Sequence, residues 1–216
     1  MPDGWARARR PWSGAIGAAT GGSATCGPAG PPGYPAAVSF LRSTAFRRIV
    51  CALGLGLALF LAASARLFVW PPTDRPVRAD AVVALGGDPG QLRAQQAIAL
   101  ARAGYAPVAL ISLGGAVAAP CPHPVPGVRI VCFRADPLDT RGEAEFVGRA
   151  AARHHWSTLL LVPGTTQATR ARMLFARCTP ARLVVVPQAE ATSRLPFAVA
   201  YEWGALVKAL VVQRHC

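Results

Sequence analysis

The chain lacks the charge pattern of a nucleic-acid-binding protein, despite a net charge of +13 and a pI near 11.1. Seven basic residues precede position 71, and the sixteen that follow are scattered among nine acidic residues without a dense basic run. Lys208 is the only lysine, and so much Arg and Ala is as typical of a GC-rich coding sequence as of selected chemistry. Binding to nucleic acid is therefore not predicted.

Motifs for metals and common cofactors are also missing. The cysteines have no C-x-x-C spacing, so a metal site that uses His123 or His215 is only the alternative to disulfides. The stretch "GGDPGQ" at residues 86–91 fits neither the dinucleotide-binding fingerprint nor the phosphate-binding P-loop. The sequence thus predicts no metal ion and no bound NAD or ATP cofactor.

The N-terminal part of the chain has little that could build a core. Residues 1–46 are rich in Gly, Pro, Ala and Ser and have no apolar periodicity, so we predict a disordered tail. Residues 49–65 are uncharged and apolar, and "RLFVW" extends them to the length of a bilayer-spanning helix. We predict a transmembrane helix within 47–70 that contacts the lipid bilayer through 49–70. A buried core helix is the alternative, and it would lack a polar face.

Basic residues set the predicted orientation of this span. Arg42, Arg47 and Arg48 precede it, which places the N-terminus in the cytoplasm and the rest of the chain outside. We therefore expect a single-pass protein of the plasma membrane, with a linker at 71–79 and an extracytoplasmic domain at 80–216.

A cleaved signal peptide competes with the retained anchor. The triplet "ASA" at 63–65 resembles a small-residue cleavage site after an apolar stretch. The leader would be unusually long unless translation starts near Val38, which N-terminal sequencing of the native protein would test. Both alternatives export residues 71–216.

Export makes disulfides possible in the second part of the chain. That part has four cysteines, whereas Cys26 and Cys51 belong to the predicted tail and span. Cys121 and Cys132 flank a short loop. Cys178 ends a predicted helix, and the C-terminal Cys216 is the expected neighbour of that helix end. We predict local pairing, Cys121 with Cys132 and Cys178 with Cys216.

The exported part alternates apolar strands with helices. Five short apolar runs predict strands: "ADAVVALGG", "PVALISLGG", "VRIVCFRA", "STLLLVPG" and "ARLVVVPQ". Helices are predicted in "QLRAQQAIALARAG", in "TRGEAEFVGRAAARHH", from about Thr166, and in "FAVAYEWGALVKALVVQ". Continuous apolar strands between helices favour a Rossmann-like α/β fold, a three-layer parallel sheet of about five strands.

Ligands of such sheets bind beyond the carboxyl ends of the strands. Glycines there allow backbone amides to approach a ligand, helix N-termini attract anions, and an arginine adds a charge-assisted contact. The residues that fit this description are Gly86, Gly87, Asp88, Ser112, Gly114, Gly115, Asp139, Thr140, Thr165, Thr166 and Arg170. Together they predict an anion site.

Each of these features also has a purely structural explanation. Thr140 and Glu143 have the spacing of a capping box, and Thr165 and Thr166 could cap the helix that follows them. Arg170 could belong to a solvated helix face.

The order and spacing of these segments resemble the SanA, ElyC and YdcF family, catalogued as a domain of unknown function. The resemblance rests on "ADAVVALGG" with Arg93 downstream, "ISLGG", "DTRGEAEF" and "TTQATRARMLF", over residues 80 to about 190. The flanking "FVWPPTD" and "YEWGALVKALVVQ" are similar to membrane-anchored, actinobacterial-type members. The family implies a Rossmann-like domain tethered by one N-terminal helix and linked to envelope integrity and peptidoglycan precursor metabolism.

Carried over by position, the resemblance places the glycine turn on Gly86 and Gly87, the polar helix start on Thr140 and Glu143, and the basic position on Arg170. Many members have a histidine where this chain has Gln167, and glutamine cannot exchange a proton near neutral pH. Asp88 and Glu143 remain as candidate catalytic acids or bases.

We therefore expect an envelope protein whose exported domain binds an anionic, phosphate-bearing precursor. A hydrolase or transferase acting on that precursor is one alternative. A non-enzymatic module that docks a membrane partner through its C-terminal helix is the other.

Overall fold

The computed structural model describes residues 44–88, 91–114, 120–190 and 192–216. Its centre is a parallel sheet in the order β3-β2-β1-β4-β5. The strands are β1 (Ala81–Ala84), β2 (Val108–Ser112), β3 (Arg129–Phe133), β4 (Thr158–Val162) and β5 (Arg182–Val185). The five predicted strands and the Rossmann-like α/β fold are confirmed.

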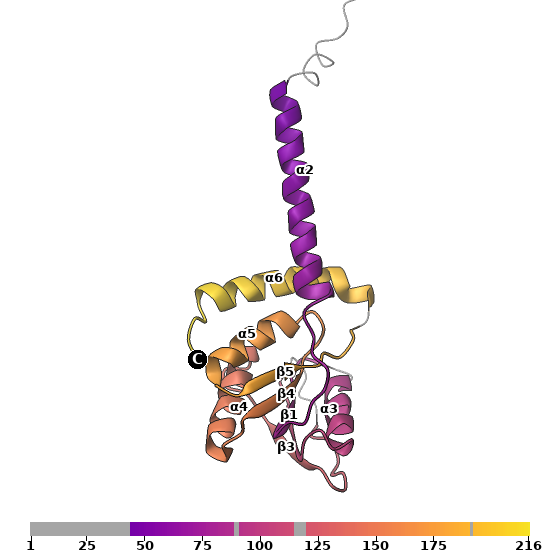
Figure 1. Cartoon of the computed structure of the whole chain (residues 1–216), viewed down its shortest axis with the longest axis vertical. Coiled ribbons are helices and arrows are strands. Elements are labelled where there is room, and N and C mark those ends of the chain that lie inside the picture. The colour runs from indigo at the N-terminus through magenta and orange to yellow at the C-terminus, as the bar shows by residue number, and fades with distance from the viewer. Residues whose placement is uncertain (1–43, 89–90, 115–119, 191) are drawn as a thin grey trace, which may run out of the picture. The chain divides into compact units, whose positions relative to one another are not determined.

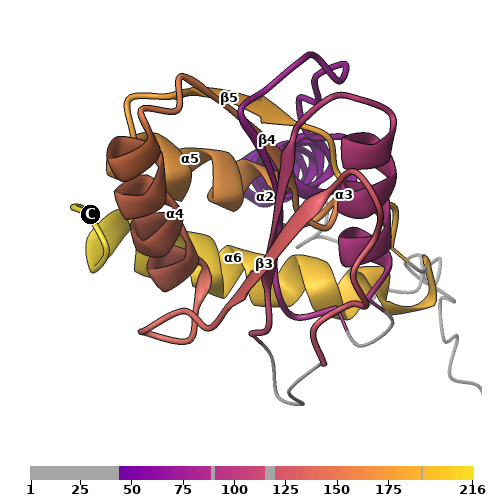
Figure 2. The ribbon, with the colours of Figure 1, turned by 90° about the horizontal axis from the view of Figure 1, so that it is seen from below.

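Helices cover both faces of this sheet, which gives three layers (Figures 1 and 2). The helices that cover the faces are α3 (Leu92–Arg102), α4 (Thr140–His154) and α5 (Ala168–Cys178). Helix α6 (Leu195–Val211), preceded by the short 3-10 turn η2 (Thr192–Arg194), packs against α5. Figure 2 shows α4 and α5 on one side of the sheet and α3 on the other.

Alternating residues of the strands pack into two apolar cores, one on each face of the sheet, because successive side chains of a strand point to opposite faces. Val83, Leu110 and Leu161 pack with α4 and α5, whereas Val82 and Leu160 pack with α3. All five side chains are buried. The central strands are thus apolar on both faces, which is why they read as continuous hydrophobic runs in the sequence.

One long helix precedes the sheet. Helix α2 (Thr44–Ser64) continues into a π-helical turn, η1 (Ala65–Val69), and together they are long and apolar enough to cross a membrane. The helix begins at Thr44, three residues before the predicted start at 47, and residues 1–43 of the predicted tail lie outside the described residues. Contacts group the chain into residues 1–47 and 48–216, and the second unit holds the sheet and most of α2.

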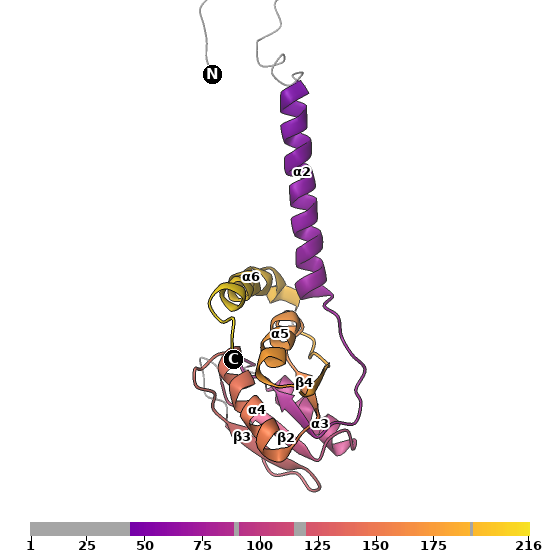
Figure 3. The same ribbon diagram turned by 60° about the vertical axis from the view of Figure 1, so that its left-hand side comes forward.

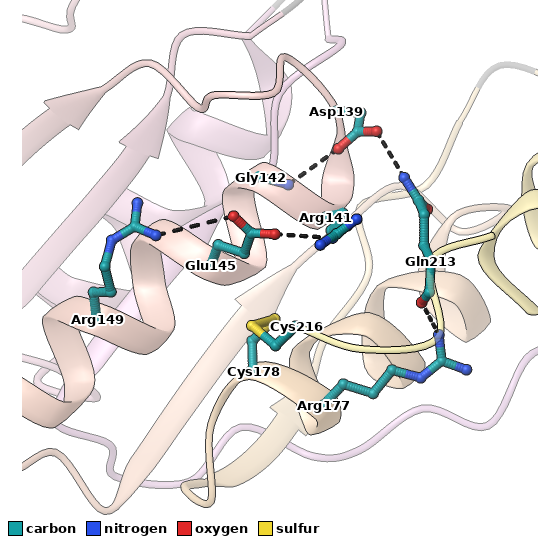
Figure 4. The surroundings of a disulfide bond; sticks show 9 residues. All are labelled: Asp139, Arg141, Gly142, Glu145, Arg149, Arg177, Cys178, Gln213 and Cys216. Atoms are coloured by element: carbon teal, nitrogen blue, oxygen red, sulfur yellow. Dashed lines mark hydrogen bonds and ion pairs between the residues drawn. A yellow bond between two sulfur atoms is a disulfide. The ribbon is translucent and has the colours of Figure 1, made fainter.

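Two disulfides join the cysteine pairs predicted from the sequence, Cys121 with Cys132 and Cys178 with Cys216. The second fastens the last residue of the chain to the end of α5 (Figure 4). Close by, Gln213 donates to the Asp139 carboxylate, and Arg177 donates to the Gln213 carbonyl (Figure 4). The chain after α6 is therefore bonded to the start of α4 and the end of α5.

Candidate functional site

A pocket of about 990 Å³ lies at the carboxyl edge of the sheet. The strand order reverses between β1 and β4, and at such a point the connections diverge and leave a crevice. Segments after β1 and β4, the starts of α4 and α5, and the first half of α6 line the pocket. The position agrees with the edge of the sheet at which a ligand site was predicted.

Eleven of the fourteen candidate site residues named from the sequence line this pocket. They are Gly86, Gly87, Asp88, Arg93, Gly114, Asp139, Thr140, Glu143, Thr166, Gln167 and Arg170. Ser112 is not in the lining but hydrogen-bonds to Glu143, and Thr165 donates to the Gln188 carbonyl instead. Gly115 lies outside the described residues. Ligand binding by any of them stays a prediction.

The glycine turn after β1 needs glycine at both positions. Gly87 has a φ of 83°, and a Cβ on Gly86 would come within 2.6 Å of the Gly114 carbonyl oxygen. Their amides, however, already have partners: Gly86 N–H donates to Glu143 Oε1, and Gly87 N–H donates to the Gly114 oxygen, both at 2.7 Å. The expectation that these amides face a ligand is therefore not met.

Arg93 connects four segments of the pocket floor. Its Nη1 donates to the Gly86 carbonyl at 2.6 Å and to Gln167 Oε1 at 3.0 Å. Its Nη2 pairs with Glu190 Oε1 at 3.0 Å. The backbone N–H of Arg93 donates to Asp88 Oδ2, so the candidate base Asp88 supports the start of α3.

Gln167 extends this network to α4. Its Nε2 donates to Thr140 Oγ1 at 2.9 Å while its Oε1 accepts from Arg93, and the Gln167 side chain is buried. The Gln167 side-chain amide thus accepts one hydrogen bond and donates another, and a neutral histidine could make the same two bonds. Gln167 therefore connects α3, α4 and α5 without a group that titrates near neutral pH.

Arg170 is paired rather than presented to a ligand. Its Nε and Nη2 donate to the two carboxylate oxygens of Glu202 on α6, each at 2.7 Å, and both side chains are buried. Burial alone would lower the pKa of Arg170, but the hydrogen bonds and charge of Glu202, together with Tyr201 and Glu143, outweigh burial and raise that pKa. The alternative of a solvated face is wrong for Arg170, whereas an anion contact from this arginine stays a prediction.

Two predicted helix caps are also corrected. Asp139, and not Thr140, caps α4, because Asp139 Oδ1 accepts from the Gly142 amide. Thr166 does not cap α5 either, since its hydroxyl donates to Glu190 Oε2 at 2.7 Å. Glu143, freed from a capping box, reaches the glycine turn instead.

Glu143 is a buried carboxyl group of the pocket with a raised pKa. Burial raises its pKa, and hydrogen bonds from Ser112 and Gly86, with the charges of Arg93 and Arg170, offset only part of that rise. The side chain is 4% exposed. A raised pKa at a buried pocket carboxyl is a property of general acids and bases, so Glu143 is a better candidate than Asp88.

The raised pKa of Glu143 predicts a pH dependence of stability. Below the ordinary value of 4.5, the group is protonated whether the chain is folded or unfolded, and it leaves stability unchanged. Above that value the unfolded chain ionises first, so the folded state loses stability as pH rises toward the folded-state pKa. We expect Glu143→Gln to remove this loss, with a gap that widens by at most about 1.4 kcal/mol per pH unit.

Chemical denaturation of wild type and variant across pH measures this gap directly. Asp74, Asp80 and Asp139 have lowered pKa values and destabilise the fold in acid, but they cancel in the difference between the two proteins. A gap that stays constant from pH 4 upward would contradict a raised pKa at Glu143.

Three charged residues of the pocket were not predicted from the sequence. Arg194, Glu190 and Glu202 come from β5's connection to α6 and from α6 itself. With them the lining holds five carboxyl groups and three arginines, which is not the composition of a simple anion site. A usable signal was present for Glu202, the only acidic residue in the mostly apolar segment 195–212, whose other charged residue is Lys208.

The mouth of the pocket is mostly apolar, although Arg194 is also exposed there. Four of its lining side chains are large, hydrophobic or aromatic and exposed: Leu92, Leu138, Phe197 and Tyr201. A charged floor thus lies below an exposed apolar mouth.

Comparisons with known proteins add no relative: the chain matches no protein-family model, no curated protein and no solved structure.

Proposed function

We propose that this chain is a membrane-anchored envelope protein whose extracytoplasmic pocket binds a phosphate-bearing precursor. Membership of the SanA, ElyC and YdcF family is part of the same proposal, and the link to the envelope and to peptidoglycan depends on it. The two disulfides support an oxidising compartment for residues 121–216.

Packing around the end of α2 supports a retained anchor over a cleaved leader. Trp203 of α6 donates to Ser64 Oγ at 2.9 Å and stacks on Phe60 at a centroid distance of 5.3 Å. Phe68, just beyond, is fully buried, and Thr169 donates to the Leu67 carbonyl at 2.6 Å. Cleavage after the "ASA" triplet at 63–65 would remove part of this packing.

The observation that carries the binding proposal is the charged floor of the pocket. Arg93, Glu143 and Arg170 are all less than a tenth exposed, in a cavity with room for a small molecule. Buried ion pairs add little to stability, because desolvation offsets most of their attraction. Charged side chains that are buried in a pocket despite this desolvation penalty are typical of ligand-binding sites.

The charge balance narrows the ligand. Carboxylates accept hydrogen bonds and repel a bare anion, whereas arginines favour phosphate. A ligand that brings hydroxyl donors together with a phosphate satisfies both kinds of group. Sugar phosphates have both features, whereas inorganic phosphate has only the phosphate and free sugars have only the hydroxyl groups.

Ligand-induced stabilisation of the full chain in detergent micelles tests this proposal. We expect glucose 1-phosphate to raise the melting temperature more than inorganic phosphate or glucose does at the same concentration. Saturation to a hundred times the dissociation constant stabilises a fold by about 2.7 kcal/mol. Arg194→Ala, at the exposed mouth, should weaken binding about ten- to a hundredfold, since a lost charge-assisted hydrogen bond is worth about 1.5–3 kcal/mol.

Arg153→Ala is the matched control, because Arg153 is exposed at the far end of α4 and should leave binding unchanged. Equal stabilisation by phosphate and sugar phosphate would indicate a plain anion site. Stabilisation by none of the three would contradict the binding proposal and favour an interaction module.

An enzyme is the second candidate, and the raised pKa of buried Glu143 is the observation that favours it. A carboxylic acid of this kind could donate a proton to a leaving oxygen in hydrolysis of a phosphate ester. Release of phosphate from glucose 1-phosphate that disappears in Glu143→Gln, while binding persists, would establish hydrolysis. Binding without release would leave the pocket as a binding site only.

A further inference from the structure

The outward side of α6 is apolar. Its exposed large side chains are Phe197, Tyr201, Val207, Leu210 and Val211, with exposed fractions between 50% and 79%. Val212, just after the helix, is also exposed. Most soluble helices show the reverse pattern, with their polar residues outward.

The other side of α6 is fastened to the domain. Glu202, Leu206 and Ala209 are buried, and Glu202 forms the ion pair with Arg170 of α5. The one acidic residue of the helix therefore points inward, and the outward apolar side cannot turn into the core.

The middle of α6 adjoins the predicted membrane span. Trp203 stacks on Phe60 of α2 and contacts Phe68 edge to face at 5.3 Å. Figures 1 and 3 both draw α6 beside the domain end of α2. The exposed apolar side chains of α2 thus meet α6 where Phe60 stacks on Trp203.

Charged and aromatic groups around this surface suit lipid headgroups. Arg194, Lys208 and Arg214 are exposed before, within and after the helix, and of these Lys208 also pairs with Asp139 at 3.3 Å. Tyr201 and Trp70 are exposed aromatics with polar atoms, a type enriched where hydrocarbon meets water. Apolar residues on one side, flanking cations and no outward carboxylate are the composition of helices that lie in the membrane surface.

We propose that the outward face of α6 binds the surface of the bilayer that α2 crosses, as a helix in the membrane plane. The inference rests on the proposed span of α2, but not on any ligand of the pocket. It also places Phe197 and Tyr201, and with them the mouth of the pocket, at the level of the lipid headgroups.

Site-directed spin labelling of the full chain in nanodiscs of phosphatidylcholine and phosphatidylglycerol tests this placement. Cysteines are introduced at Val207 and Val211 in separate proteins, in a background with Cys26→Ser and Cys51→Ser. Collisions with oxygen, which dissolves in lipid, are compared with collisions with a water-soluble nickel chelate. The ratio of oxygen to nickel accessibility should be severalfold higher at Val207→Cys and Val211→Cys than at Arg153→Cys, the exposed control on α4.

A label on Cys51, exposed on α2, reports the span separately in a chain with only Cys26→Ser. High oxygen access at Cys51 with water-like values at Val207→Cys and Val211→Cys would overturn the inference and leave the span intact. Labels at those positions that are shielded from both reagents would also overturn it, because a protein partner would then cover the helix. Water-like values at Cys51 would overturn the span and the inference together.

Discussion

Replacing Arg170 with Met should lower the free energy of unfolding by about 3–5 kcal/mol, because the variant leaves a buried carboxylate without a partner. Glu202 is 4% exposed, and both of its carboxylate oxygens accept from Arg170. Chemical denaturation of the full chain in detergent micelles measures the loss. Restoring an apolar pair with Arg170→Met and Glu202→Leu together should recover most of it.

Arg172→Met is the matched control, two residues along the same helix. Arg172 pairs with Asp74, but both side chains are more than a third exposed, so their ion pair should contribute less than about 1 kcal/mol. Equal losses for the Arg170 and Arg172 variants, or a double variant no more stable than Arg170→Met alone, would contradict the reasoning. An Arg170 variant can lose ligand binding simply because it unfolds. Arg194 is exposed, so its replacement tests binding without this complication.

Removing the C-terminal disulfide has the second largest expected effect. In the chain-entropy account, a bond across 38 residues stabilises by about 4 kcal/mol and one across 11 residues by about 3 kcal/mol. Cys178→Ser with Cys216→Ser should therefore lower the free energy of unfolding by about 4 kcal/mol, somewhat more than Cys121→Ser with Cys132→Ser. Denaturation of each double variant, beside reduced wild type, tests the order.

The two losses should add in reduced wild type if the disulfides act independently. A loss under 1 kcal/mol for the C-terminal pair would mean that the hydrogen bonds of Arg177 and Gln213 hold this end of the chain by themselves.

The strands and helices could be predicted because each satisfies a local rule. Buried parallel strands are continuous apolar runs, and "VVAL" or "TLLLV" can scarcely belong to an exposed element. The cap of α4 was predicted wrongly because Asp139 and Thr140 are adjacent and are both good capping residues. The sequence also could not show that Glu143 accepts from the distant Gly86 amide and not from the start of its own helix.

The pocket could be located but its electrostatics could not. Strand ends and glycines point to the site from the sequence, whereas the pairing of its charges depends on contacts between distant segments. Arg93 meets Glu190 across 97 residues, and Arg170 meets Glu202 across 32. No spacing rule connects such residues, so Arg170 looked available to an anion although it already has a carboxylate partner, and the pairing of Arg93 could not be foreseen.

The fastening of α6 at several points has a consequence for binding thermodynamics. Glu202 holds the helix to α5, Trp203 holds it to α2, and Gln213 and Cys216 hold the chain that follows it. This wall of the pocket loses its conformational entropy during folding and oxidation, before any ligand arrives. A ligand therefore meets a preorganised wall, and none of its interaction energy is spent on ordering a lid.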